Sequence, residues 1–175
     1  MTTVNEPAPG DVVGCEEVGR WNTDGQASEG HSGDEIYDVR IGQHDCFDRV
    51  VFDLGGKADV GFAVRYVAQV HAGGSGEPMP VAGDAVLEVV VTAPVSGYPG
   101  GEDGDVDAFG RSGELLYSEG QLVGLTNLRA VRFAGFFESR ATFAIGLRDE
   151  VPFRAFIALD DEDGHRTLIV DIAHE

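Results

Sequence analysis

The chain has 175 residues, 42% of them hydrophobic, and a formal net charge of -19 from 12 basic and 31 acidic residues. This length fits one domain, with or without a tail. The acidic excess argues against binding to nucleic acid or to anionic membrane surfaces, which require basic patches. No window of about 18 apolar residues predicts a transmembrane helix.

The first 33 residues form an acidic segment that predicts a flexible leader. Residues 1–35 contain eight acidic residues and a single basic one, Arg20. A segment of this composition buries too little apolar surface to fold alone. Trp21 is the exception, and its ring is expected to fold back onto the domain. Residues 1–14 have neither the basic nor the apolar region of a signal peptide.

From residue 34 to residue 175, short apolar runs between Gly-rich turns predict one all-β domain. Apolar and polar residues alternate along residues 61–70, as in a strand with one buried face. Further strands are expected at 36–41, 47–53, 85–91, 142–147, 153–159 and 167–173. Apolar residues at every third position from Leu122 to Val131 are compatible with a short helical turn. About nine short strands are typical of an antiparallel β-sandwich with little helix.

Several blocks of this domain resemble, in order, those of the actinobacterial AMIN-like domain family. They are HDCFDRVVF (44–52), VRYV (64–67), GGSGEP (73–78), VAGDAVL (81–87), FE (137–138), IGL (145–147), PFR (152–154) and LIVDI (168–172). The resemblance extends from about residue 38 to the end. It implies a non-catalytic all-β domain of the cell envelope, similar to the AMIN module that helps to place amidases and secretins. Export to the envelope or secretion is thus expected, although no signal peptide is seen.

The function implied by this resemblance is binding of a cell-wall polymer or an envelope protein through a sheet face or edge. Arg65 alternates with apolar residues of its strand, so it is expected on the outer face, where an anionic polymer could reach it. Tyr66 could join Trp21, Tyr98 and Tyr117 in an aromatic platform for sugar rings. Aromatic residues of a β-domain are more often part of the core, which is the favoured interpretation.

Asp48 and Arg49 lie where a strand begins, and their side chains should point to opposite faces. One interpretation is a carboxylate–guanidinium site for a polar ligand. The favoured one is a structural pair, with Asp171 of the last strand as the partner, because charged residues inside β-domains are usually paired.

The acidic loop 97–114 provides the alternative function, a small-molecule or calcium-binding β-domain. Asp103, Asp105, Asp107 and Glu114 occupy positions 1, 3, 5 and 12 of a calcium loop of EF-hand type. Position 6, which requires Gly, is Ala108, and no flanking helices are predicted. A metal site is therefore not favoured, and no cofactor is expected.

An enzyme is not expected, because nothing places a base, an orienting acid and an oxyanion hole together. His44 and His71 could act as bases and Ser75 as a nucleophile. The Gly-rich run 73–76 around Ser75 lacks the ending of a phosphate loop and predicts a turn. Ser75 is kept, together with Arg65 and Tyr66, as a candidate binding residue.

Cys15 and Cys46 are the only cysteines, and they allow one disulfide. It would close a loop of about 31 residues and add roughly 3 kcal/mol in the chain-entropy model. The alternative is two free thiols, with Cys46 as a small buried hydrophobe. The choice depends on the redox compartment, which the sequence leaves open.

Overall fold

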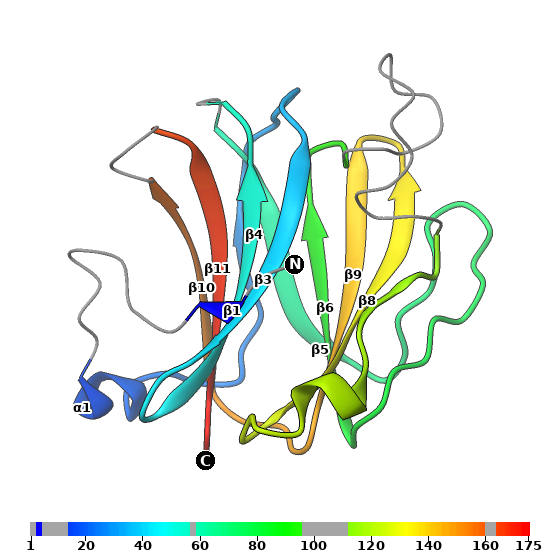
Figure 1. Ribbon diagram of the computed structural model, residues 1–175. Coiled ribbons are helices and arrows are strands. Elements are labelled where there is room, and N and C mark those ends of the chain that lie inside the picture. Colours follow the sequence, from blue (N-terminus) through cyan, green and yellow to red (C-terminus); the bar gives the residue numbers. More distant parts are fainter. Residues whose placement is uncertain (1–2, 5–13, 57–58, 96–111, 160–163) are drawn as a thin grey trace.

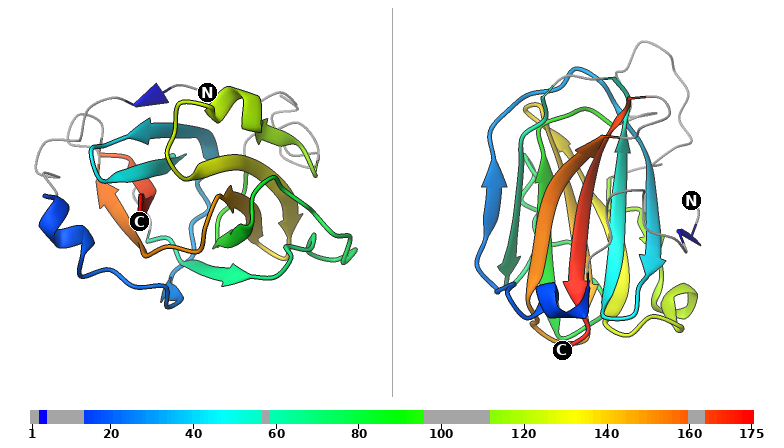
Figure 2. Two further views of the ribbon diagram at one scale, coloured as in Figure 1. Left: turned by 90° about the horizontal axis from the view of Figure 1, so that it is seen from below. Right: turned by 90° about the vertical axis from the view of Figure 1, so that its left-hand side faces the viewer.

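The computed structural model describes residues 3–4, 14–56, 59–95, 112–159 and 164–175. These residues fold as two facing β-sheets, seen side by side in Figure 1 and from two further directions in Figure 2. The described residues contain eleven strands and little helix, against about nine strands expected. The prediction of an antiparallel β-sandwich is confirmed.

The two sheets are named sheet A and sheet B. In spatial order, sheet A consists of β1 (Thr3–Val4), β3 (Ile36–Gln43), β4 (Phe47–Leu54), β11 (Arg166–Ala173) and β10 (Phe153–Leu159). Sheet B consists of β2 (Gln26–Ser28), β5 (Phe62–Val67), β6 (Ala85–Val91), β9 (Arg140–Leu147), β8 (Leu128–Phe137) and β7 (Leu115–Tyr117). Every strand pairing among the described residues is antiparallel, except that of the two-residue β1 with β3.

The core lies between the sheets and is built from alternate residues of each strand. Val50 and Phe52 of β4 are fully buried, and so is Phe143 of β9. The rings of Phe52 and Phe143 meet with their centroids 4.8 Å apart, and Phe133 of β8 lies 5.4 Å beyond. Full burial of each such side chain stabilises the fold by about 1.5–3 kcal/mol.

A hydrogen bond between side chain and backbone joins one pair of sheet edges. The Tyr117 hydroxyl in β7 of sheet B donates to the backbone oxygen of Val39 in β3 of sheet A, at 2.9 Å. Burial raises the pKa of Tyr117 to about 12, with a smaller contribution from the charge of Asp38. At neutral pH the Tyr117 hydroxyl is therefore protonated and can donate the hydrogen bond that joins β7 to β3.

The outer face of sheet B is partly covered by the loop 68–84. Val70 and Met79 of this loop pack on Ala134 and Ala144 in a second small apolar cluster. The loop comes so close that a Cβ atom at Gly146 would overlap the backbone oxygen of Ala82. The remainder of this outer face, over β2, β5 and β6, contains an open pocket that is described below.

Residues 14–33, here called the strap, were expected to belong to a flexible leader, and the structure attaches them to the sandwich. Its short helix α1 (Cys15–Val18) has no buried residue but is tied to the β3–β4 loop by the Cys15–Cys46 disulfide. The Trp21 ring folds back onto Phe47, as predicted, with the centroids 5.5 Å apart. β2 then pairs with β5, and Figure 2 shows it at the edge of the sandwich. The disulfide that the sequence left open is thus formed.

The helical turn considered for Leu122 to Val131 is not formed, because the only helical residue of this run is Leu122, the last residue of a helix that precedes it. A 3-10 helix, η1 (Glu119–Leu122), begins at a capping box formed by Ser118 and Gln121. Leu128 and Val131 instead lie in β8, and both are buried. A β-bulge shifts the register between Leu128 and Ala130, so that core-facing residues are three positions apart in a strand. No helix among the described residues is long and apolar enough to cross a membrane.

Candidate functional site

The sheet-B pocket is an open hollow of about 550 Å³ on the outer face of sheet B. Its lining includes two small apolar residues, Ala63 of β5 and Val90 of β6, which lie opposite each other in the register. Charged residues also line it, namely Glu29, Arg65, Glu88 and Arg140. The pocket thus combines an apolar floor with two guanidinium and two carboxylate groups.

Arg65 and Glu88 form a cross-strand pair at this pocket. They face each other in the β5–β6 register, and Arg65 Nε lies 3.2 Å from Glu88 Oε1. The Arg65 side chain is 65% exposed and that of Glu88 is 16% exposed, which confirms the predicted outer-face position of Arg65. An exposed pair of this kind contributes about 0.2–1 kcal/mol, so a ligand can compete for the guanidinium at little cost.

The strap side of the pocket is held by Thr92. Its hydroxyl donates to the backbone oxygen of Gly30 at 2.6 Å and accepts the N–H of Gly61 at 2.9 Å. A Cβ atom at Gly61 would overlap the Gly30 oxygen and the Thr92 hydroxyl. Glycine at 61 therefore permits the strap to approach β5 closely.

The end pocket is a second open hollow, of about 500 Å³, where the loops at one end of the sandwich meet. Its lining includes Tyr66 and three carboxylates, Asp84, Asp149 and Glu150. The Tyr66 hydroxyl donates to the backbone oxygen of Val151 at 2.6 Å and accepts its N–H at 2.9 Å. Burial raises the pKa of Tyr66 to about 12. The hydrogen bond to Val151 lowers the pKa, but by less than burial raises it. The Tyr66 hydroxyl thus anchors the backbone of the β9–β10 loop at Val151.

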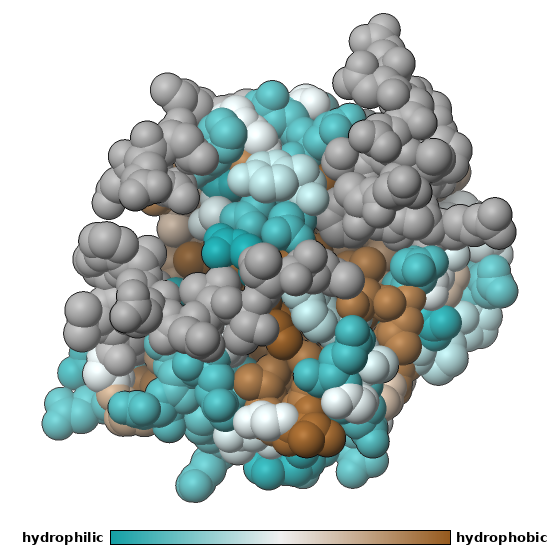
Figure 3. Space-filling view, viewed as in Figure 1, coloured by the Kyte–Doolittle hydropathy of each residue, from teal (hydrophilic) through white to brown (hydrophobic). Residues whose placement is uncertain are grey.

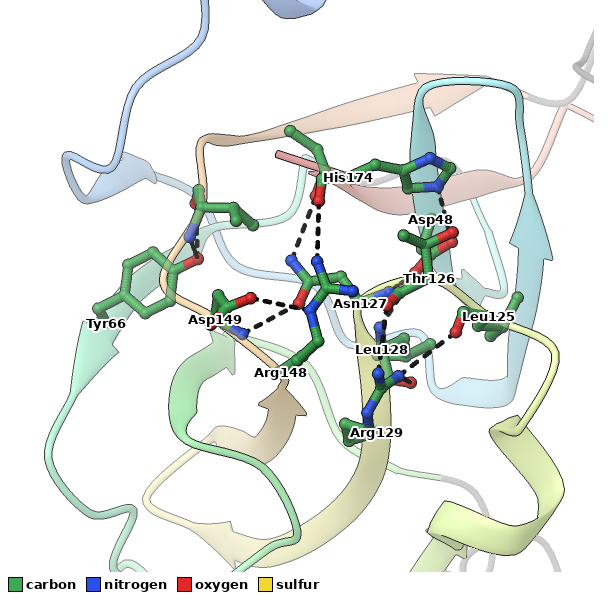
Figure 4. Close-up of polar contacts among 12 residues, drawn as sticks. Asp48, Tyr66, Leu125, Thr126, Asn127, Leu128, Arg129, Arg148, Asp149 and His174 are labelled. Atoms are coloured by element: carbon green, nitrogen blue, oxygen red, sulfur yellow. Dashed lines mark hydrogen bonds and ion pairs between the residues drawn. The ribbon is translucent and has the colours of Figure 1, made fainter.

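Asp48 is the centre of a buried polar network beside this end of the sandwich (Figure 4). Its Oδ2 atom accepts the backbone N–H groups of Asn127 at 2.7 Å and Leu128 at 3.0 Å, and its Oδ1 atom lies 3.1 Å from Nε2 of His174. Asn127 Oδ1 in turn accepts the N–H of Asp149 at 3.1 Å. The network joins β4, the segment before β8, the β9–β10 loop and the end of β11.

Sequence reasoning missed Asn127 and His174 in this network. Both are single polar residues next to a strand, without a spacing that predicts a partner. The only available signal was the polar Asp48 beside an apolar run, since a fully buried carboxylate requires donors from elsewhere in the chain.

Arg49 points to the opposite face of β4 and is also buried, at 2% exposure. Its Nε and Nη2 atoms donate to the two carboxylate oxygens of Asp171, at 2.6 and 2.8 Å, which confirms the predicted pair. Arg154 of β10 donates to the same carboxylate at 2.8 Å, and its guanidinium lies 5.1 Å from the Trp21 ring and 4.5 Å from the Phe156 ring. These residues form the Arg49–Asp171–Arg154 cluster on the outer side of sheet A.

The other candidate residues lie in two loops, 68–84 and the β3–β4 loop. Ser75 sits in the predicted turn, where its hydroxyl accepts the N–H of Glu77 at 3.3 Å. His44 stacks on Phe47 at 4.3 Å between the ring centroids, while His71 belongs to the loop 68–84. Neither of the two pockets described above is lined by His44, His71 or Ser75.

The aromatic platform and the acidic loop are described only in part. Tyr117 is buried at 7% exposure and Trp21 packs on Phe47, so these two rings are parts of the packing and not of a common platform with Tyr66. Tyr98 lies outside the described residues, as do the predicted calcium ligands Asp103, Asp105 and Asp107. Glu114 is described, and its backbone oxygen accepts the N–H of Phe133. Among the described residues, no group of three or more His, Cys, Asp or Glu side chains is placed to hold a metal ion.

Large exposed apolar side chains are distributed over five segments of the described chain. They are Tyr37, Leu115, Val123, Phe137 and Leu159. Figure 3 shows apolar side chains gathered in the lower half of one face, near η1 and β8, with polar side chains around them. Apolar atoms make up about half of the accessible surface of folded proteins, so this pattern alone does not identify a binding site.

The comparisons with known proteins address the family of the chain. A sequence model described as the AMIN-like domain matches residues 34–174, which is most of the chain and leaves the strap outside. No curated protein and no solved structure gives a significant match. The match agrees with the ordered sequence blocks and with the all-β sandwich. The chain belongs to the AMIN-like domain family.

Proposed function

We propose that this AMIN-like domain is a non-enzymatic binding module of the cell envelope that holds a cell-wall polymer in the sheet-B pocket. The observation that carries this proposal is the open pocket of about 550 Å³ in which the exposed Arg65 side chain meets Glu88. Open pockets with a few convergent polar groups are the usual starting point for a ligand site.

The charges of the two pockets favour the sheet-B pocket for such a polymer. The two glutamates of this pocket are balanced by Arg65 and Arg140, whereas the ionisable residues that line the end pocket are three carboxylates and Tyr66. The chain carries a net charge of -19, so an anionic polymer requires a site where basic side chains are placed together. The two arginines offer the planar guanidinium groups that suit carboxylate or phosphate.

The form of the site also supports binding to a polymer. The pocket lies on a sheet face and is open to solvent, so an extended chain can cross it. Of the residues that could take part in catalysis, His71 and Ser75 lie in the loop 68–84 and His44 lies in the β3–β4 loop, and none of the three lines the sheet-B pocket. The Cys15–Cys46 disulfide supports an envelope location, because such bonds persist in oxidising compartments.

The end pocket supports a second candidate function, binding of a cationic small molecule. Asp84, Asp149 and Glu150 would attract a positive group there. An envelope protein docked on the face of sheet B would use the same residues as the polymer, and the experiment below separates these possibilities.

A retention assay on isolated cell-wall material tests the proposal. The wild type should be retained, and retention should weaken as salt is added, because charged contacts are screened. Arg65→Ala should lower retention about tenfold, the size expected when a charge-assisted hydrogen bond of ~1.5 kcal/mol is lost.

Arg148→Ala is the matched control, since Arg148 is 46% exposed and also pairs with a neighbouring carboxylate, that of Asp149, which lines the end pocket. This variant should be retained like the wild type. Equal retention of Arg65→Ala, or no retention of the wild type, would contradict the polymer assignment and favour the small-molecule or protein alternatives.

A further inference from the structure

One wall of the sheet-B pocket comes from the strap. Ser28, Glu29 and Gly30 line the pocket beside residues of β5 and β6. The strap lies before residue 34, where the match to the AMIN-like domain begins. The family domain thus supplies the face of the pocket, and the segment in front of it supplies a wall.

The strand that carries this wall is weakly held by its own pairing. β2 has three residues, pairs only with β5 among the described strands, and has no buried side chain. Strands in globular proteins usually have about five or six residues. Thr92 fixes the wall at Gly30, and further contacts are needed to fix the strand that leads into it.

Gln26 supplies such contacts across the sandwich. Its backbone pairs with Val64 in sheet B, whereas its side chain reaches β10 in sheet A. The amide Nε2 donates to the backbone oxygen of Phe153 at 3.0 Å, and Oε1 accepts the backbone N–H of Ala155 at 2.8 Å. One carboxamide thus satisfies a backbone acceptor and a backbone donor two residues apart on β10, as a neighbouring strand would.

We propose that Gln26 is a positioning residue that clips the strap to β10 and so holds residues 28–30 as the wall of the sheet-B pocket. The identity of the ligand rests on the proposed function, but the clip itself does not. The strap then determines how closely a ligand is enclosed over Arg65 and Glu88. A change in the strap would alter binding without a change in the family domain.

The test compares Gln26→Met with Gln43→Met. Methionine keeps the length of the side chain and removes the amide. Gln43 is the matched control, because it is an exposed strand residue whose side chain makes one long contact, 3.4 Å, to the Thr126 hydroxyl. Backbone hydrogen exchange in segments 26–28 and 62–64 should become about tenfold faster in Gln26→Met and should stay unchanged in Gln43→Met.

Retention on isolated cell-wall material is measured in parallel. It should fall at least threefold in Gln26→Met, roughly the effect of losing one weak contact, and should not change in Gln43→Met. Unchanged exchange in Gln26→Met would overturn the clip. Faster exchange with full retention, while Arg65→Ala still loses retention, would overturn the role of the strap as a pocket wall and leave the proposed function intact.

If the wild type is not retained, the proposed function fails, and the exchange comparison alone decides whether Gln26 positions the strap. Should Gln26→Met not fold, Gln26→Glu serves instead, because its carboxylate still accepts the N–H of Ala155 but cannot donate to Phe153. Faster exchange in this variant supports the clip, and unchanged exchange overturns it.

Discussion

Two arginine–carboxylate pairs, one on the outer side of each sheet, share their chemistry and their cross-strand position but differ in solvent exposure and in the number of hydrogen bonds. Arg49 and Asp171 face each other in the β4–β11 register, as Arg65 and Glu88 do in the β5–β6 register. The first pair makes two hydrogen bonds and its side chains are 3% and 0% exposed, whereas the second makes one contact at 3.2 Å and its arginine is 65% exposed.

This comparison shows that solvent exposure, and not residue type, separates a structural pair from a candidate binding group. In a buried pair each charge depends on its partner, because water cannot replace it. In an exposed pair water solvates both groups, so the partner can be exchanged for a ligand at little cost. The following predictions test the difference, beginning with the largest effect.

Asp171→Ala should destabilise the domain by about 3–5 kcal/mol, because it leaves the buried guanidinium of Arg49 without its carboxylate. Urea unfolding followed by fluorescence measures the change. Glu88→Ala, which removes the carboxylate of the exposed pair, should cost under about 1 kcal/mol. Similar losses for both variants would show that burial does not distinguish the pairs.

Removal of the disulfide by Cys15→Ser with Cys46→Ser should cost about 3–4 kcal/mol, because it frees a loop that spans 31 residues in the unfolded chain. Unfolding by urea under non-reducing conditions gives the value. A loss below about 1 kcal/mol would indicate that the strap is held almost entirely by its non-covalent contacts, which include those of Trp21, β2, Gln26 and the Gly30–Thr92 hydrogen bond.

Tyr117→Phe should cost about 1 kcal/mol at neutral pH, because the buried backbone oxygen of Val39 loses its donor. The folded-state pKa of Tyr117 and of Tyr66 is raised to about 12 from an ordinary 10. Both tyrosines therefore contribute stability that is fully present below pH 10 and is lost as the pH rises through about 12. Melting curves at pH 9 to 12 should show a smaller decline for the double variant Tyr66→Phe with Tyr117→Phe than for the wild type.

Arg65→Ala should have the smallest effect on stability, within about 0.5 kcal/mol, as for most surface substitutions. Thermal melting of this variant next to the wild type provides the measurement. A loss above about 1.5 kcal/mol would mean that Arg65 supports the fold, and a change in wall retention could then no longer be assigned to a lost ligand contact.

Much of the sandwich could be predicted from the sequence because its strands alternate. The strand expected at 85–91 is β6 with the same bounds, and the last three strands are correct within two residues at each end. Alternation also places Arg65 on the outer face. The Arg49–Asp171 pair could be predicted because a charged residue inside a strand requires a partner, and Asp171 was a candidate on a later strand.

The remaining features depend on contacts that leave no periodic signal. β2 has the sequence Gln-Ala-Ser and becomes a strand because β5 and β10 provide partners for its backbone and for the Gln26 side chain. The bulge in β8 places the buried Leu128 and Val131 three positions apart, and together with Leu122 and Leu125, which precede β8, they give a period that mimics a helical turn. The network around Asp48 joins residues up to 126 positions apart, beyond the reach of local patterns.

The disulfide also determines how the domain would respond to mechanical force. Cys15 is joined to Cys46, just before β4 begins, and β4 is the antiparallel neighbour of the C-terminal strand β11. The first contacts at this end are the His174 N–H to the Cys46 oxygen, at 3.0 Å, and the Phe47–Ala173 pair. A force applied between the strap and the end of β11 would therefore act on the β4–β11 hydrogen bonds one at a time, beginning at the Phe47–Ala173 end. Reduction of the disulfide would move the loading point to Trp21 and β2, and the strap would detach before the β4–β11 pairing bears any tension.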